Sequence, residues 1–185
     1  FSDIKSRLFI YTGGFFMEFE EISVDELRDY LIEKKVEFIP YTQEQIDLKK
    51  AELGVMPEIL EEYYLKIGWF DDVEMAGMGN YIWPLEQLNI LTPEDYFNYV
   101  LEGDESYVLK ETSNFLQFGG EAVSVDTFAV KETDCDLPNP PLYGWGYTYE
   151  HLAEEGYYYC IDSEELPTVK NYFSVIKSSI ESIMK

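Results

Sequence analysis

Hydrophobic residues at helical spacing mark the first half of the chain. Ser23 and Glu26 form a capping-box pattern, and the apolar residues that follow them share one face. These two signals predict a helix over residues 24–34. Thr42 opens a second capping pattern, which predicts another helix with a thinner apolar stripe.

Further helices are indicated by proline and glycine at helix ends. A third helix is predicted between Pro57 and Gly68, because proline suits the first helical position and glycine suits the residue that closes a helix. Its apolar and aromatic residues fall on one face, which we expect in the core. Two more helices are predicted, one from Thr92 to about Leu101 and one after Pro167.

Between these helices the hydrophobic period changes to two, which is typical of strands. Gly119-Gly120 lies inside one such segment and predicts the turn of a β-hairpin. The segments with strand character are 81–83, 116–129, 143–149 and 157–161. Helices lead, strands cluster in the middle and a helix closes, so the predicted fold class is α+β, with helices packed around a mainly antiparallel sheet.

The N-terminal residues precede the first methionine, Met17, and we treat residues 1–16 as an extension to a single domain over 17–185. Two apolar runs flank Gly13-Gly14 there and predict a hairpin. No apolar run has the length of a membrane span and no secretory signal pattern is present, so the expected location is the cytoplasm.

The charge balance restricts the partners. The chain has 37 Asp and Glu against 13 Lys and Arg, a formal net charge of −24. Such a field repels nucleic acid and anionic membranes and attracts basic proteins. We therefore expect a basic protein partner, no nucleic acid, no membrane, and a monomer or weak homodimer. The alternative is that acidity serves only solubility or reflects an acidic proteome.

Candidate catalytic groups are sparse. His151 is the only histidine, and neither Cys135 nor Cys160 lies in a nucleophile motif or at metal-ligand spacing. We expect two free thiols, no catalytic residues, no cofactor and no metal site. The acidic run at 71–74 lacks the glycine and the spaced ligands of a calcium loop. A hydrolase that uses a pair of carboxylates stays an alternative, because an acidic chain supplies many candidates.

Several motifs occur in an order that resembles the SUKH superfamily, the Smi/Knr-like immunity and regulatory domains. They are a helix opened by proline and followed by glycine, an apolar-Pro-Leu element, a glycine-containing hairpin and a Pro-rich link to an aromatic strand. In this chain they are Leu53–Gly68, Ile82–Leu88, Phe115–Gly120 with Thr127–Val130, and Pro140–Trp145. Two features depart from the family pattern: Ile67 stands where asparagine often precedes the glycine, and 101–113 has the character of an insertion.

The resemblance implies a non-enzymatic SUKH-like α+β domain. Such proteins often neutralise a cognate toxin, commonly a nuclease or deaminase, by direct binding; other members are regulatory or scaffold modules in envelope or signalling pathways. Aromatic residues beside carboxylates are typical of an anchor for a basic surface, although the aromatic pair here has the equal alternative of folding back onto the core. The expected contact residues are Glu61, Glu62, Trp69, Phe70, Asp71, Asp72 and Glu74.

Overall fold

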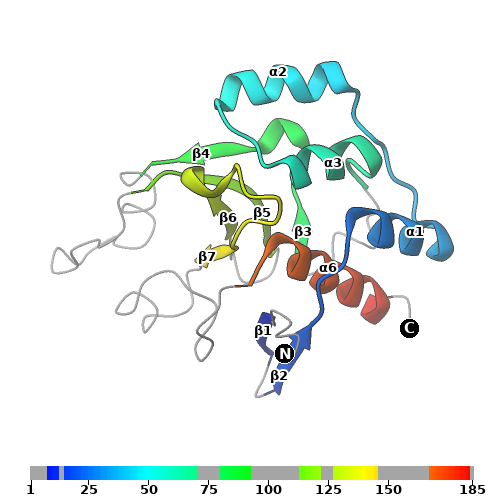
Figure 1. The fold of residues 1–185 in the computed structure, drawn as a ribbon. Helices are drawn as coiled ribbons and strands as arrows, with labels where there is room; N and C mark the ends of the chain where they lie inside the picture. The colour runs from blue at the N-terminus through cyan, green and yellow to red at the C-terminus, as the bar shows by residue number, and fades with distance from the viewer. Residues whose placement is uncertain are drawn as a thin grey trace, which may run out of the picture.

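A computed structural model describes residues 8–12, 15–70, 80–92, 113–121, 127–145 and 167–183. Figure 1 shows helices α1, α3 and α6 gathered beside an antiparallel sheet, with α2 on the outside of the molecule. Helices and an antiparallel sheet are segregated along the chain, so the fold is α+β, as the sequence predicts.

The first two helices begin at the capping boxes that the sequence indicates. Helix α1 is Val24–Lys34 and α2 is Gln43–Leu53. In both, the N-cap hydroxyl accepts a backbone N–H and the side chain three residues on accepts the N-cap N–H in return. The predicted start of each helix and the predicted end of α1 are confirmed.

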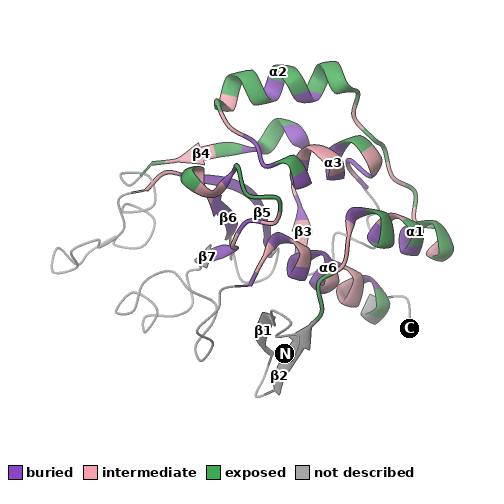
Figure 2. Cartoon of the chain, in the orientation of Figure 1, coloured by how far each residue is buried: buried purple, intermediate pink, exposed green. Residues whose placement is uncertain are grey.

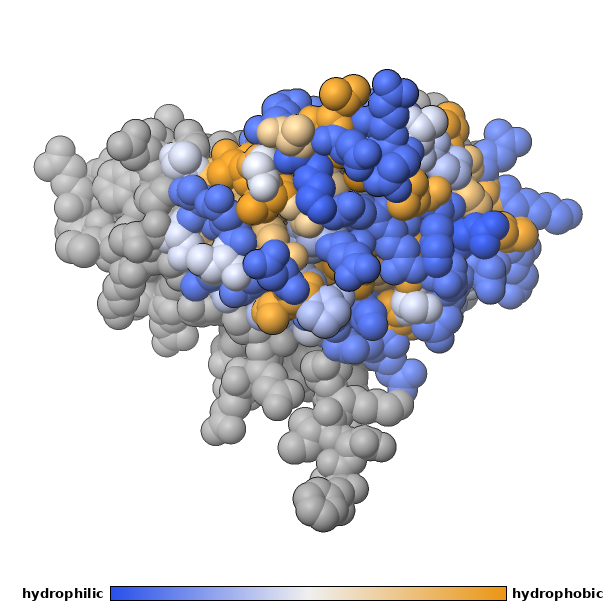
Figure 3. Space-filling view, turned by 45° about the horizontal axis from the view of Figure 1, so that its top comes forward, coloured by the Kyte–Doolittle hydropathy of each residue, from blue (hydrophilic) through white to orange (hydrophobic). Residues whose placement is uncertain are grey.

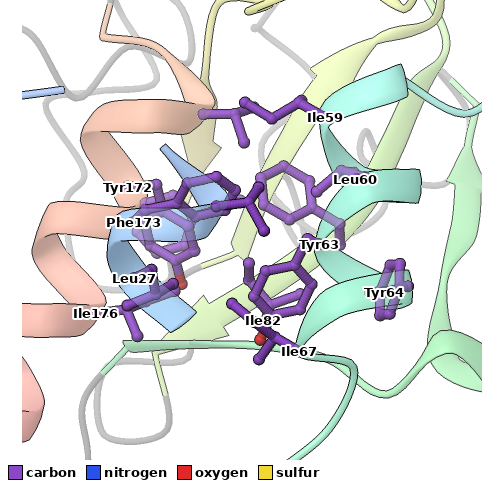
Figure 4. Packing of buried hydrophobic residues seen from close by; sticks show 14 of the residues in the cluster. Leu27, Ile59, Leu60, Tyr63, Tyr64, Ile67, Ile82, Tyr172, Phe173 and Ile176 are labelled. Atoms are coloured by element: carbon purple, nitrogen blue, oxygen red, sulfur yellow. The ribbon is translucent and has the colours of Figure 1, made fainter. Parts of the chain in front are cut away.

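Helix α3, Glu58–Lys66, follows Pro57 and buries Ile59, Leu60, Tyr63 and Tyr64. The last helix, α6, is Val169–Ile183, as expected after Pro167. Figure 4 shows the side chains of α3 and α6 pointing toward one another, with Leu27 of α1 beside them. Tyr63 stacks on Phe173 of α6 with ring centroids 5.7 Å apart, so aromatic packing joins the two helices.

The main sheet has the order β3-β5-β6-β7, and β4 also pairs with β5. All of these pairs are antiparallel. The strands are β3 Asn80–Ile82, β4 Asn89–Leu91, β5 Phe115–Glu121, β6 Thr127–Lys131 and β7 Tyr143–Trp145. Short 3-10 turns, Leu85–Gln87 (η2) and Glu132–Asp134 (η3), complete this region.

The hairpin of β5 and β6 is confirmed, but the predicted turn at Gly119-Gly120 is wrong. Both glycines lie inside β5 and pair with β3 and β6. A Cβ on Gly119 would lie 2.9 Å from the Tyr81 carbonyl oxygen and 3.3 Å from the Tyr172 ring. The glycine is therefore required by the close packing of α6 and β3 onto β5.

The N-terminal hairpin is present as β1, Leu8–Thr12, paired antiparallel with β2, Phe15–Phe19. Strand β2 runs across the boundary drawn between residues 16 and 17 and contacts α6. Beyond β2, Glu21 accepts hydrogen bonds from Thr168 and Asn139, both at 2.9 Å. These bonds tie the start of the domain to the N-terminus of α6, where a carboxylate is favourable.

Several predicted elements lie outside the described residues. They are the helix from Thr92 to Leu101, the strand 157–161, and the aromatic alternation beyond β7 at Tyr147 and Tyr149. Within β7, Tyr143 is buried and packs against Phe115 with ring centroids 5.3 Å apart. The Tyr143 side chain therefore packs into the interior, as alternate aromatic residues on a strand often do.

Candidate functional site

An isolated antiparallel bridge joins the segment after α1 to the end of α3. Ile39 donates its N–H to the Trp69 carbonyl at 2.7 Å, and Trp69 donates to the Ile39 carbonyl at 3.1 Å. Gly68 precedes the bridge with φ of +73°, a conformation that glycine adopts without a steric cost. The bridge thus fixes the backbones of two segments that lie far apart in the sequence.

The bridge carries an apolar surface, which we call the Trp69 surface and define as Ile39, Pro40, Trp69 and Tyr81. The Trp69 and Tyr81 rings meet edge to face with centroids 6.4 Å apart. Ile39 is 69% exposed, Pro40 is exposed, and both rings are half-buried. Figure 2 shows the segment between α1 and α2 as exposed to intermediate along its length. The surface offers apolar area on a backbone held by two hydrogen bonds.

The two aromatic residues predicted as an anchor separate in the structure. Phe70 is 6% exposed and belongs to the hydrophobic core, so the expectation that it contacts a partner is corrected. Its ring lies parallel to Trp69 with centroids 6.4 Å apart and supports that ring from the core side. Of the alternatives that the sequence leaves open, folding back onto the core holds for Phe70, whereas Trp69 keeps part of its ring exposed.

Two of the acidic residues in the predicted contact set form ion pairs within the protein, and the other three lie outside the described residues. Glu61 binds the ammonium group of Lys50 on α2 at 2.5 Å, and Glu62 binds Lys66 at 2.7 Å. These two carboxylates are therefore engaged in pairs within the protein. Asp71, Asp72 and Glu74 lie outside the described residues.

Several lysines among the described residues contact carboxylates or an aromatic ring of the same chain. Lys66 also binds Asp25 at 2.8 Å, and the nearly buried Lys49 binds Glu52 at 2.8 Å. Lys34 and Lys177 approach the Tyr30 ring at 5.5 and 5.1 Å. Such contacts partly neutralise these cations and leave the surplus of carboxylates to determine the surface potential.

The chain segments that attach to one end of the sheet are rich in carboxylates. Asn80 pairs with Glu121, Gly120 with Thr127, and Thr127 with Trp145, so these strand ends lie side by side. The connecting sequences 71–79, 122–126 and 146–166 contain ten Asp and Glu and no Lys or Arg. Tyr81 of the Trp69 surface is next to Asn80 at this end of β3. The apolar surface therefore lies near the points where the acidic segments join the sheet.

A polar cluster holds α2 against η2. The Tyr41 hydroxyl donates to Glu86 at 2.9 Å and accepts from the Leu85 N–H at 3.2 Å. Burial and the Glu86 carboxylate raise the pKa of Tyr41 to about 12, so the phenol keeps its proton at neutral pH. Lys49 reaches the Glu86 carbonyl at 3.4 Å. Because these groups bind one another, the cluster has a structural role in docking α2.

The chemistry of the described residues is limited. Cys135 is a free, buried thiol, and desolvation raises its pKa to about 12, which suppresses the reactive thiolate. His151 and Cys160 lie outside the described residues. Within the described ranges, no group of three or more His, Cys, Asp or Glu is arranged to hold a metal ion. In the same part of the chain, no helix is both long enough and apolar enough to cross a membrane.

The sequence indicated Trp69 but missed Ile39 and Tyr81. A local pattern does not reveal them, because Ile39 reaches Trp69 through backbone hydrogen bonds between segments thirty residues apart in the chain. Among the described residues on the face in view in Figure 3, hydrophilic side chains predominate and hydrophobic ones form small separate groups. An exposed isoleucine is common and acquires meaning only from its neighbours in space.

Comparisons with known proteins do not add to this picture: no protein-family model, no curated protein and no solved structure matches the chain. The SUKH resemblance stays a prediction from the order of the motifs.

Proposed function

We propose that this chain is a non-enzymatic acidic protein that binds a basic protein partner. The resemblance to SUKH immunity domains makes a toxin domain, such as a nuclease or deaminase, the preferred partner. Binding over the basic surface of such a toxin would block the channel through which its anionic substrate enters. This arrangement requires no catalytic group on the acidic protein.

One observation carries the proposal: carboxylates far outnumber basic residues, and several of the lysines already bind carboxylates of the same chain. The net charge is −24, and Lys49, Lys50 and Lys66 each bind carboxylates of the same chain. A partner with positive potential would be drawn to the remaining carboxylates from a distance, which raises its association rate. The affinity would come from a small number of buried contacts.

The experiment is a pull-down with the purified chain from the lysate of its own organism, washed at low and then high salt. We expect a basic toxin domain that is released by salt and whose association slows about tenfold or more as salt is raised from low to physiological concentration. Inhibition of the captured toxin's activity by the purified chain is the second readout.

A variant with Glu37→Lys, Glu44→Lys and Glu58→Lys tests whether the negative charge of the chain speeds association. These residues are exposed, and Glu44 and Glu58 lie on the outer faces of α2 and α3, so the fold should be retained. The variant should associate more slowly while its dissociation rate changes little. Capture of a partner that is not a toxin would favour the regulatory or scaffold alternative, and salt-insensitive binding would contradict the steering argument.

A further inference from the structure

We propose that the Trp69 surface anchors the basic partner and takes one bulky apolar side chain that the partner presents between lysine or arginine residues. This inference rests on the proposed function and deepens it by assigning the contact surface. The surface differs from the contact set expected from the sequence, because it adds Ile39 and Tyr81 and omits Phe70.

The first argument is rigidity. Two backbone hydrogen bonds hold Ile39 to Trp69, and Phe70 and Tyr81 pack against the Trp69 ring from two directions. The hydroxyl of Tyr172 on α6 donates to the Tyr81 carbonyl at 3.1 Å, and this bond holds the Tyr81 backbone in place. A surface that is already ordered loses little conformational entropy when a partner binds, which favours an anchoring role.

The second argument is exposure. Ile39 is the most exposed large hydrophobic residue in the described part of the chain, at 69%. Leu48 on α2 is similar at 67%, but its helix carries polar and charged residues around it. Ile39 is bridged through its backbone to Trp69, and the half-exposed Trp69 ring meets that of Tyr81, so this exposed aliphatic residue lies with two aromatic residue types that are enriched in interface hot spots.

The third argument is the charge around the surface, which selects a basic protein as the occupant. Exposed Glu37 lies two residues before Ile39, in the segment that the bridge holds against Trp69. Lys66, which precedes Trp69 by three residues, is held by Asp25 and Glu62. In the sequence, Asp71 and Asp72 follow Phe70 directly. An apolar group flanked by cations would complement both the centre and the rim of this surface.

The test uses defined peptides and NMR chemical shifts of the whole chain. The probes are a lysine-rich peptide with one central leucine, the same peptide with serine at the centre, and a leucine peptide in which serines replace the lysines. At low salt the lysine-leucine peptide should bind about tenfold more tightly than the lysine-serine peptide, because only it buries an apolar side chain. Its largest shifts should fall on Ile39, the Trp69 indole N–H and Tyr81.

Two variants distinguish binding at the Trp69 surface from nonspecific hydrophobic binding. Ile39→Ala should remove most of the preference for leucine, whereas Leu48→Ala, matched in exposure, should leave it unchanged. Both side chains are mainly exposed, so both variants are expected to fold. The chemical-shift changes measured on the unaltered chain locate the peptide without either variant. Equal binding of the two lysine peptides, shifts elsewhere, or an equal effect of Leu48→Ala would overturn this inference while the proposed function stands.

The remaining outcomes test the choice of a basic occupant and the proposed function itself. Binding of the leucine-serine peptide as tight as that of the lysine-leucine peptide would overturn the choice of a basic occupant. Failure of both lysine-rich peptides to bind at low salt would contradict the inference together with the proposed function, since a basic partner would then find no affinity for the chain.

Discussion

Gly54 and Gly68 have similar backbone conformations in very different surroundings. Their φ angles are +81° and +73°, both in the left-handed region. A Cβ on Gly54 would have no atom within 4 Å, whereas a Cβ on Gly68 would lie 2.0 Å from the Ile39 oxygen and 2.8 Å from the Pro40 Cα. The backbone at Gly68 therefore determines how closely the segment after α1 approaches α3.

This difference predicts unequal costs for two identical substitutions. Gly54→Ala should lower the free energy of unfolding by about 1 kcal/mol, the cost of the left-handed conformation alone. Gly68→Ala should cost about 3 kcal/mol or more, because two backbone segments must also move apart. Denaturant unfolding of both variants measures the costs. A similar loss for the two would show that the bridge yields easily and that Ile39 is not held rigidly beside Trp69.

At the scale of elements, the helices were predictable because their signals are local. Ser23 and Thr42 define helix starts within four residues of sequence, and the structure has both capping boxes. The sheet was less predictable, because strand pairing depends on distant residues. Gly119 was taken for a turn, yet it lies in β5 because Tyr172 of α6 and Tyr81 of β3 need the space.

The same reasoning explains how far the candidate site could be predicted. Trp69 follows a recognisable helix end, so its place after α3 was predictable, but the sequence left open whether its ring is exposed or folds back onto the core. Neither the burial of Phe70 nor the proximity of Ile39 was accessible, because both depend on how the segment after α1 meets α3. The pairing of Glu61 with Lys50 likewise joins two helices, and a single helix does not reveal it.

The two capping boxes differ in charge, and this difference predicts a pH effect for α1. Glu26 accepts from the Ser23 N–H at 2.7 Å and from the Ser23 hydroxyl at 2.8 Å, and these bonds lower its pKa. A lowered pKa in the folded state stabilises the fold above the unfolded pKa, and this contribution is lost as pH falls through the folded pKa. Gln45 fills the same position in α2 without a charge.

Ser23→Ala should therefore lower the free energy of unfolding by about 1 kcal/mol at neutral pH, and by less once Glu26 is protonated. Thr42→Ala should cost a similar amount at neutral pH, with little dependence on pH in the acidic range. Unfolding curves at several pH values provide the comparison, and NMR titration should show the Glu26 pKa rising in Ser23→Ala. A parallel pH dependence in the two variants would argue against the carboxylate as the source.

At the scale of the whole molecule, repulsion among carboxylates opposes the folded state. The ion pairs that the structure shows, such as Lys50 with Glu61 and Lys66 with Asp25, lie at or near the surface. Exposed pairs of this kind contribute about 0–1 kcal/mol each. A net charge of −24 on a chain of 185 residues places many more carboxylates near one another than these lysines neutralise. The same excess that would attract a basic partner thus destabilises the chain on its own.

This balance predicts that modest salt stabilises the protein. Screening acts over about 10 Å at 0.1 M ionic strength, so it weakens the repulsion spread over the surface more than it weakens close ion pairs. The melting temperature should rise as sodium chloride is added at neutral pH. The gain should shrink as the pH is lowered toward the sequence pI of about 4.1, where the net charge that causes the repulsion disappears. If salt instead lowered the melting temperature at neutral pH, attractive pairs would dominate the electrostatics, and the surplus of carboxylates would be too dispersed to steer a basic partner.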